Sequence, residues 1–279
     1  VKSQYTNIYC FSSIEESLEY DFDAYIIATP AITHTELAKI IISNNKPVLV
    51  EKPLSLSLSE SKEIKSHLID NNGKLIVGHL LLFHPAIQKI KTMINNGEIG
   101  KIQYIYSNRL NLGTIRKEEN VFWSFAPHDI ALFQFFSNSF PDKVDSMGGD
   151  FLQKNIHDTT ITYLKYPNGI QGHIYVSWLH PFKEHRLVVI GSKGSLHFED
   201  SLENKPLLYY EKVDSRSEDL LSPRNKLVKQ IEYESILPLE KELIYFFDII
   251  KGKPINIANI DEGIDVIKIL EMATKSLNS

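Results

Sequence analysis

Four short apolar runs recur along the first eighty residues of the chain. They are Ile8–Phe11, Tyr25–Ala28, Val48–Val50 and Leu75–Val77, and none of them alternates with polar residues. Strands that are buried on both faces of a parallel sheet have this pattern, rich in β-branched and aromatic side chains. The runs therefore predict four buried strands.

Helical patterns occupy the intervals between these runs. Ser13, Thr33 and Ser57 each precede a glutamate by three residues, which is the spacing of the capping box at a helix N-terminus. The sequence Asn71, Asn72, Gly73 is typical of a helix end. Strands that alternate with capped helices predict a doubly wound α/β sheet.

The pattern changes at Pro85. Helices are predicted at Pro85–Asn95, Ala126–Phe136, Pro238–Lys251 and Asp261–Leu277. Strands separated by turns are predicted at Ile102–Asn111, Thr159–Tyr166, Ile170–Ser177, Arg186–Ile190 and Ser195–Glu199. Residues 201–237 are predicted as loops with a weak strand at Leu207–Lys212. Consecutive strands joined by tight turns favour an antiparallel sheet.

The expected fold is therefore α/β in two parts. Residues 1–80 are expected to form an incomplete doubly wound, Rossmann-like parallel sheet. Residues 81–279 are expected to form an α+β domain with an open, mainly antiparallel sheet. The cleft between two such domains is a usual place for a small-molecule site.

Composition and charge argue against several other classes of protein. The net charge of −5 and the lack of a Lys/Arg stripe argue against nucleic-acid binding. No apolar run has the length of about 18 residues that a membrane span needs. Cys10 is the single cysteine, which excludes a disulfide framework, and no histidine or carboxylate spacing fits a metal site. The polar N-terminus has no signal-peptide pattern, so a cytoplasmic location is expected.

The carboxyl ends of two predicted strands carry the candidate chemistry, because ligands bind there in open parallel sheets. One segment runs from Ala28 to His34, and the other is Glu51, Lys52 and Pro53. Lys52 directly follows a buried strand, and Pro53 stiffens the turn through a peptide bond that is either cis or trans. The alternative for Lys52 is a solvated lysine in a loop.

His128 is the second candidate. Pro127 precedes it, and proline is favoured at the first position of a helix, so His128 is expected in a first helical turn. There the helix dipole would lower the pKa of the imidazole and favour its neutral, basic form. The alternative is a capping or half-buried structural histidine.

Five segments together resemble the glucose–fructose oxidoreductase/inositol dehydrogenase/MocA (Gfo/Idh/MocA) family: ATPAITH, VLVEKPLSLS, GHLLLFHPAI, GEIGKI and WSFAPHDI. The resemblance covers essentially the whole chain. The stretch NRLNLGTIRKEENVFWSFAPHDI is most similar to the branch that acts on sugar nucleotides in surface-polysaccharide pathways. The resemblance implies an oxidoreductase that moves a hydride between NAD or NADP and a carbon of a sugar or sugar nucleotide.

The resemblance also implies which residues form the site. Lys52 and His128 would be the catalytic pair, in which one takes the hydroxyl proton and the other orients the oxygen. The residues implied to contact the cofactor are Ala28, Thr29, Pro30, His34, Glu51, Lys52 and Pro53. Those implied to contact the substrate are Arg109, Asn111, Arg116, Ser124 and Asp129, with Arg116 facing a phosphate or carboxylate. The alternative for the substrate set is an ordinary solvated sheet face.

The chain differs from the family pattern in two places. Many relatives carry an aspartate four residues before the catalytic histidine, where this chain has Ser124, so the relay to His128 is expected either to be weaker or to be served by Asp129. The GxGxxG turn of the family is absent, and Gly73 is the first glycine. We therefore expect Val1 to begin a fragment of a longer protein, and the 279-residue chain to bind NAD(P) only weakly.

A non-enzymatic alternative follows from the same differences. The chain would then be a cofactor-free relative that binds a sugar or acts as an oligomeric scaffold. A glycine motif encoded in frame before Val1 would favour the enzyme, and a genuine start codon at that point would favour the alternative. The open sheet suggests a homo-oligomer in either case.

Overall fold

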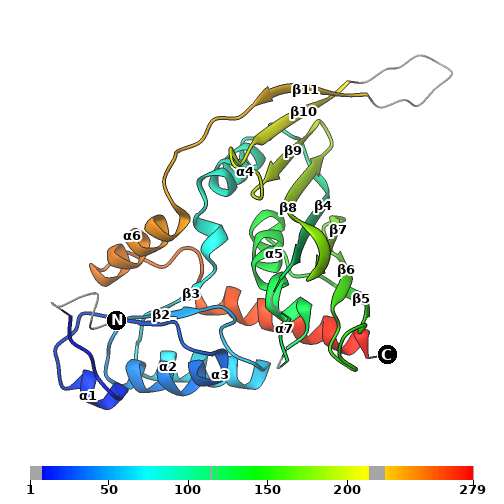
Figure 1. Cartoon of the computed structure of the whole chain (residues 1–279). Helices are drawn as coiled ribbons and strands as arrows, with labels where there is room; N and C mark the ends of the chain where they lie inside the picture. The colour runs from blue at the N-terminus through cyan, green and yellow to red at the C-terminus, as the bar shows by residue number, and fades with distance from the viewer. Residues whose placement is uncertain (1–7, 114, 118, 214–223, 279) are drawn as a thin grey trace.

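The computed structural model describes residues 8–113, 115–117, 119–213 and 224–278, which fold around two β-sheets (Figure 1). The first sheet is parallel and has the strand order β1-β2-β3. The second has the order β11-β10-β9-β8-β4-β7-β6-β5 and is mainly antiparallel. The predicted fold class, a small Rossmann-like sheet followed by an open and mainly antiparallel sheet, is confirmed.

Three of the four predicted buried runs form the parallel sheet. These strands are β1 (Tyr25–Ile27), β2 (Val48–Glu51) and β3 (Leu75–Gly78). The last matched pair between β2 and β3 is Glu51 and Gly78. The residues that follow these strands therefore leave the sheet side by side, at its carboxyl edge.

Helices cover both faces of the parallel sheet (Figure 1). On one face lie α2 (His34–Ser43) and α3 (Leu58–Asp70), as the apolar spacing predicts. On the other face lies α6 (Pro238–Ile250), whose Phe246 and Ile249 pack against Leu49 and Ile76. Strand β3 is buried on both faces, as are the three apolar residues of β2, whereas Ile26 of β1 is 52% exposed.

The predicted strand at Ile8–Phe11 is wrong. Residues 8–11 form no strand, and their aromatic rings pack next to the short helix α1 (Ile14–Leu18) instead. The ring centroid of Tyr20 lies 5.4 Å from that of Tyr9 and 4.8 Å from that of Phe11. This apolar run therefore packs through tilted aromatic ring contacts and not through strand pairing.

At two of the three predicted capping boxes, the first residue caps the helix through its side chain. The hydroxyls of Ser13 and Ser57 accept hydrogen bonds from the backbone amides three residues later. Thr33 does not cap α2, because a 3₁₀ turn, η1 (Ala31–Thr33), precedes that helix. The Thr33 hydroxyl donates instead to the Pro30 carbonyl at 2.8 Å.

The second half contains most of the remaining elements. Before the large sheet come the 3₁₀ helix η2 (Leu80–Phe83) and α4 (Pro85–Asn95). The eight strands are β4 (Ile102–Leu112), β5 (Lys143–Gly149), β6 (Thr159–Lys165), β7 (Gln171–Ser177), β8 (Leu179–Gly191), β9 (Gly194–Glu199), β10 (Leu207–Val213) and β11 (Arg224–Gln230). The sequence pattern did not predict β5 or β11, and residues 214–223 of the segment predicted as loops lie outside the described residues.

The long helix α5 (Val121–Ser137) packs on one face of the large sheet, against β4, β6 and β7 (Figure 1). It begins five residues before the predicted start at Ala126. The Asn120 side chain caps it by accepting from the Trp123 amide, and Val121 and Phe122 are fully buried. The cap and this burial outweigh the lost hydrogen bond at Pro127, which lies inside the helix.

The last helix, α7 (Ile260–Leu277), contacts both sheets. A Cβ at Gly263 would lie 2.7 Å from the Val77 side chain, so any larger residue would require Val77 or α7 to shift. The Trp123 indole on α5 donates to Thr274 at 2.9 Å. One core of buried apolar residues runs across the predicted domain boundary at residues 80 and 81.

Candidate functional site

Lys52 and His128 are brought together at the carboxyl edge of the parallel sheet. The Lys52 ammonium donates a hydrogen bond to the Ser124 carbonyl at 3.1 Å. Ser124 lies one turn before His128 on α5. The end of β2 and the middle of α5, which are far apart in the sequence, therefore contribute to one site.

The environment of Lys52 favours the loss of its charge. Burial lowers the pKa of the ammonium, and the carboxylates of Glu119 and Glu51 partly oppose this effect. The positive charges of Arg109 and Arg116 lower the pKa further. The amine is thereby shifted toward the neutral form, which can accept a proton.

His128 lies in the interior of α5, so the predicted place in a first helical turn is wrong. Burial, and not the helix dipole, lowers the pKa of its imidazole well below the ordinary value, and the charge of Lys52 adds to the effect. The Nδ1 atom is buried and has no hydrogen-bond partner among the described residues. His128 is consequently a neutral imidazole with a free ring nitrogen near Lys52.

Arg109 and Asp129 bind each other. The Arg109 guanidinium donates two hydrogen bonds to the Asp129 carboxylate, at 2.7 and 3.2 Å. Asp129 is 2% exposed. The expectation that Asp129 serves His128 is corrected, because its carboxylate is used by Arg109. Contact of either residue with a substrate stays a prediction.

The other residues expected to contact substrate lie around this pair. Ser124 is buried, and its backbone carbonyl is the acceptor for Lys52. Arg116 is exposed, and its guanidinium lies 3.9 Å from the Glu119 carboxylate. Asn111 is half-buried near the end of β4. Since the charge of Arg116 acts on Lys52, this exposed cation lies close to the site.

The residues expected to contact a cofactor fall into two groups. Ala28, Thr29 and Pro30 are exposed beyond the end of β1. His34 is buried, with ring nitrogens 2.8 Å from the Pro53 carbonyl and 2.9 Å from the Thr29 carbonyl. His34 therefore connects the loops that follow β1 and β2. The Lys52–Pro53 peptide bond is cis, and Glu51 Oε2 accepts from the Lys52 amide at 3.2 Å.

Two further buried groups near Lys52 were not selected from the sequence. His79 follows β3 directly, as Lys52 follows β2, and it is 1% exposed. Glu242 on α6 is also 1% exposed, and the charge of Glu51 acts on it. The rule that selected Lys52, a polar residue just past a buried strand, also selects His79. No sequence signal marks Glu242, because its place depends on how α6 packs.

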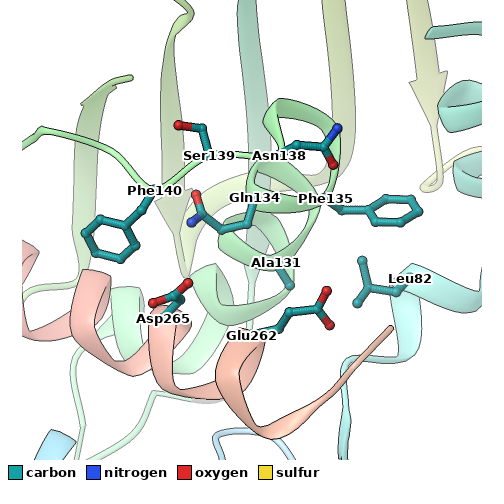
Figure 2. A pocket seen from close by; sticks show the side chains of 9 residues that line it. All are labelled: Leu82, Ala131, Gln134, Phe135, Asn138, Ser139, Phe140, Glu262 and Asp265. Atoms are coloured by element: carbon teal, nitrogen blue, oxygen red, sulfur yellow. The ribbon is translucent and has the colours of Figure 1, made fainter. Parts of the chain in front are cut away.

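A separate cavity of about 290 Å³ lies between η2, α5 and the first turns of α7. Figure 2 shows the carboxylates of Glu262 and Asp265 on α7 facing Ala131 and Gln134 on α5. Burial raises the pKa of both carboxyl groups. The residues that line this cavity do not include Lys52, His79 or His128.

The part of the chain that the structure describes contains neither a metal-binding cluster nor a helix that could span a membrane. No group of three or more His, Cys, Asp or Glu side chains there is placed to hold a metal ion. None of the helices there combines the length and the apolar character that crossing a bilayer requires.

A Rossmann-like sheet whose edge meets a second, open-sheet domain is an arrangement seen in dinucleotide-dependent oxidoreductases. Residues 2–79 match the oxidoreductase family with the NAD-binding Rossmann fold, and residues 87–197 match the GFO/IDH/MocA C-terminal domain. The chain therefore belongs to the Gfo/Idh/MocA oxidoreductase family.

Curated relatives share part of their length with the chain. Scyllo-inositol 2-dehydrogenase (NAD⁺) from Bacillus subtilis strain 168 is 30% identical over 185 residues, which cover 62% of this chain and 54% of that protein. An uncharacterized oxidoreductase from Streptococcus pneumoniae serotype 4 is 23% identical over 88% of this chain and 76% of its own length. The chain thus spans about half to three quarters of these relatives.

Solved structures share the fold. UDP-N-acetylglucosamine 3-dehydrogenase from Acidithiobacillus ferrooxidans has a TM-score of 0.82 at 20% identity, covering 99% of this chain and 84% of that one. An inositol dehydrogenase homolog from Azotobacter vinelandii, in complex with NADH and myo-inositol, has a TM-score of 0.77 at 18% identity. The match covers 95% of this chain and 78% of that one.

Proposed function

We propose that this chain forms the reaction site of an NAD(P)-dependent dehydrogenase that acts on a hydroxyl group of a sugar or sugar nucleotide. The observation that carries the proposal is the hydrogen bond from Lys52 to the Ser124 carbonyl. It places a lysine with a lowered pKa beside His128, an imidazole with a free ring nitrogen. A lysine with a lowered pKa and a neutral imidazole at one strand edge can bind a hydroxyl group and take up its proton.

The residues at this edge fit the nicotinamide end of the cofactor. Ala28, Thr29 and Pro30 leave an exposed surface beyond β1, and His128 Nδ1 is a buried polar atom without a partner among the described residues. When bound, the nicotinamide ring would exchange a hydride with the carbon that carries the hydroxyl. Lys52 or His128 would take the hydroxyl proton, and the other would orient the oxygen.

A sugar nucleotide is supported as the substrate class by Arg116. Its exposed guanidinium acts electrostatically on Lys52 and can bind a phosphate through two parallel hydrogen bonds. Similar proteins are named as dehydrogenases of inositols and of UDP-N-acetylglucosamine. The shared chemistry is the oxidation of a ring hydroxyl group.

A second candidate is a cofactor-free protein that binds a sugar or serves as a scaffold. The absence of a GxGxxG sequence and the serine at position 124 favour it. The two candidates differ in whether reduced nicotinamide appears when the chain is supplied with substrate. No turnover at millimolar NAD⁺ or NADP⁺, with myo-inositol or UDP-N-acetylglucosamine, would favour this second candidate.

The catalytic assignment is tested by Lys52→Ala and His128→Ala. Each variant should lower turnover by about 10²-fold or more, because each removes a group that handles the hydroxyl proton. The matched controls are Lys62→Ala and His67→Ala on α3, which should keep the parent rate. Unchanged turnover in both site variants would reject the roles of Lys52 and His128.

A further inference from the structure

We propose that His79 is a positioning residue for Lys52: a ring nitrogen of the neutral imidazole accepts a hydrogen bond from the Lys52 ammonium. The Ser124 carbonyl accepts another, so the remaining donor is directed at the substrate hydroxyl. The functional part of this inference rests on the proposed dehydrogenase function. The contact between the two side chains can be tested without any substrate.

The strand register places His79 beside Lys52. Glu51 and Gly78 are the last matched pair of the β2–β3 ladder, so Lys52 and His79 are the next residues out of neighbouring parallel strands. His79 is the N-cap residue of η2, which packs against α5, the helix that carries Ser124 and His128. Three separate elements therefore converge around the Lys52 side chain.

The hydrogen-bonding needs of the two groups are complementary. An ammonium has three N–H donors, and within the described residues the Lys52 group donates only to the Ser124 carbonyl. His79 is buried, and both of its ring nitrogens lack partners among the described residues. A buried polar atom without a partner is destabilising, so a donor close by is expected to use it.

The state of His79 suits an acceptor. Burial lowers the pKa of its imidazole to about 4, and the charge of Lys52 contributes, so the ring is neutral at physiological pH. A neutral imidazole has one bare nitrogen that can accept from an ammonium. Since both ring nitrogens are enclosed by protein, a side chain of the same site is a better partner for them than an incoming ligand.

Substitution of His79 leaves the charged groups near Lys52 unchanged. The groups that act on the Lys52 pKa are Glu119, Glu51, Arg109 and Arg116, and Lys52 in turn acts on His128. His79 carries no charge at neutral pH, so its removal would alter Lys52 only through a hydrogen bond or through packing. A change in the pKa of Lys52 would therefore report on its hydrogen bond to His79 or on packing, and not on a lost charge.

The experiment measures that pKa through the pH dependence of acetylation of Lys52, followed by mass spectrometry on the ligand-free chain. His79→Phe removes the acceptor while keeping an aromatic ring, and should lower the pKa of Lys52 by about 1–2 pH units, because an ammonium loses a charge-assisted hydrogen bond. His79→Gln retains an acceptor and should keep the parent value. His79→Leu repeats the first test if the Phe variant does not fold.

The matched control is His84→Phe. His84 is also buried, but its Nδ1 accepts from the Ala86 amide, so this variant should lose thermal stability without changing Lys52. An unchanged Lys52 pKa in His79→Phe overturns the inference, and so does an equal change in the Phe and Gln variants. Either result leaves the dehydrogenase proposal intact, since that proposal fails only in the turnover test of Lys52 and His128.

Discussion

At the scale of single residues, burial sets the chemistry of the site. Lys52, His79 and His128 are cationic or titratable groups, and for all three burial is the first cause of a lowered pKa. The positive charge of Lys52 also lowers the pKa of both histidines, and Arg109 and Arg116 lower that of Lys52. Burial thus shifts all three groups toward their neutral forms, more than a solvated site would.

The Arg109–Asp129 pair gives a prediction about stability. Asp129→Asn removes the hydrogen-bonded counter-charge of the largely buried Arg109 guanidinium and leaves only the more weakly acting Asp200, so it should destabilise the fold by about 3 kcal/mol. Glu63→Gln is the control, because Glu63 is exposed and lies 3.8 Å from Lys39, and a surface pair of this kind contributes about 0–1 kcal/mol. Urea denaturation measures the free energy of unfolding of both variants. A loss in Asp129→Asn no larger than that of the control would mean that Arg109 finds another partner.

The sequence located Lys52 because a polar residue directly after a buried strand is visible in the pattern. It did not show what Lys52 touches, since the Ser124 carbonyl is a backbone atom on an element far along the chain. Asp129 shows the same limit. Its position next to His128 in the sequence suggested a shared role, but on a helix adjacent residues point in different directions.

At the scale of elements, apolar periodicity predicted the strands and helices that bury a continuous face. It missed β5, whose sequence Lys143–Gly149 ends in two glycines, and β11, where Arg224–Gln230 contains only two apolar residues. Both are edge strands that exist through pairing with β6 and β10. The start of α5 was misplaced because Pro127 was taken as a first-turn residue, whereas the cap is Asn120.

Helix α6 gives a prediction about pH. Glu242 has no hydrogen-bond partner among the described residues, and burial raises its pKa to about 8, with the charge of Glu51 contributing. The folded chain thus retains a proton that the unfolded chain releases near 4.5, so this group makes the fold less stable as the pH rises between these two values. Glu242→Gln should remove this pH-dependent loss of stability.

The measurement is the melting temperature across this pH range. Glu242→Gln should melt several degrees above the parent near pH 8 and at the same temperature near pH 4.5, given about 2–4 °C per kcal/mol for chains of roughly this size. Glu240→Gln, an exposed site in the first turn of the same helix, is the control. A constant difference at every pH would point to packing and not to the proton.

At the scale of the whole molecule, the sequence contains no GxGxxG turn. In Rossmann folds that turn and the helix after it bind the pyrophosphate. We therefore expect NAD⁺ and NADP⁺ to bind the 279-residue chain more weakly than micromolar in calorimetric titrations. A micromolar dissociation constant would show that other groups of this chain bind the phosphates.

The large sheet leaves one face without a covering helix among the described residues (Figure 1). Met147 is 71% exposed and Ile161 on the adjacent strand is 43% exposed. Apolar side chains on an uncovered sheet face are a usual feature of protein interfaces. The homo-oligomer expected from the sequence stays a prediction, and this face is where we expect the contact.

Helix α7 has a consequence for the geometry of the site. It packs against β3 through Gly263, and Thr274 further along accepts from Trp123 on α5, the helix that bears His128. Helix α7 therefore connects the parallel sheet, at whose edge Lys52 lies, to the helix that carries His128. We therefore expect substitutions along the final helix to shift His128 relative to Lys52 although neither residue belongs to it.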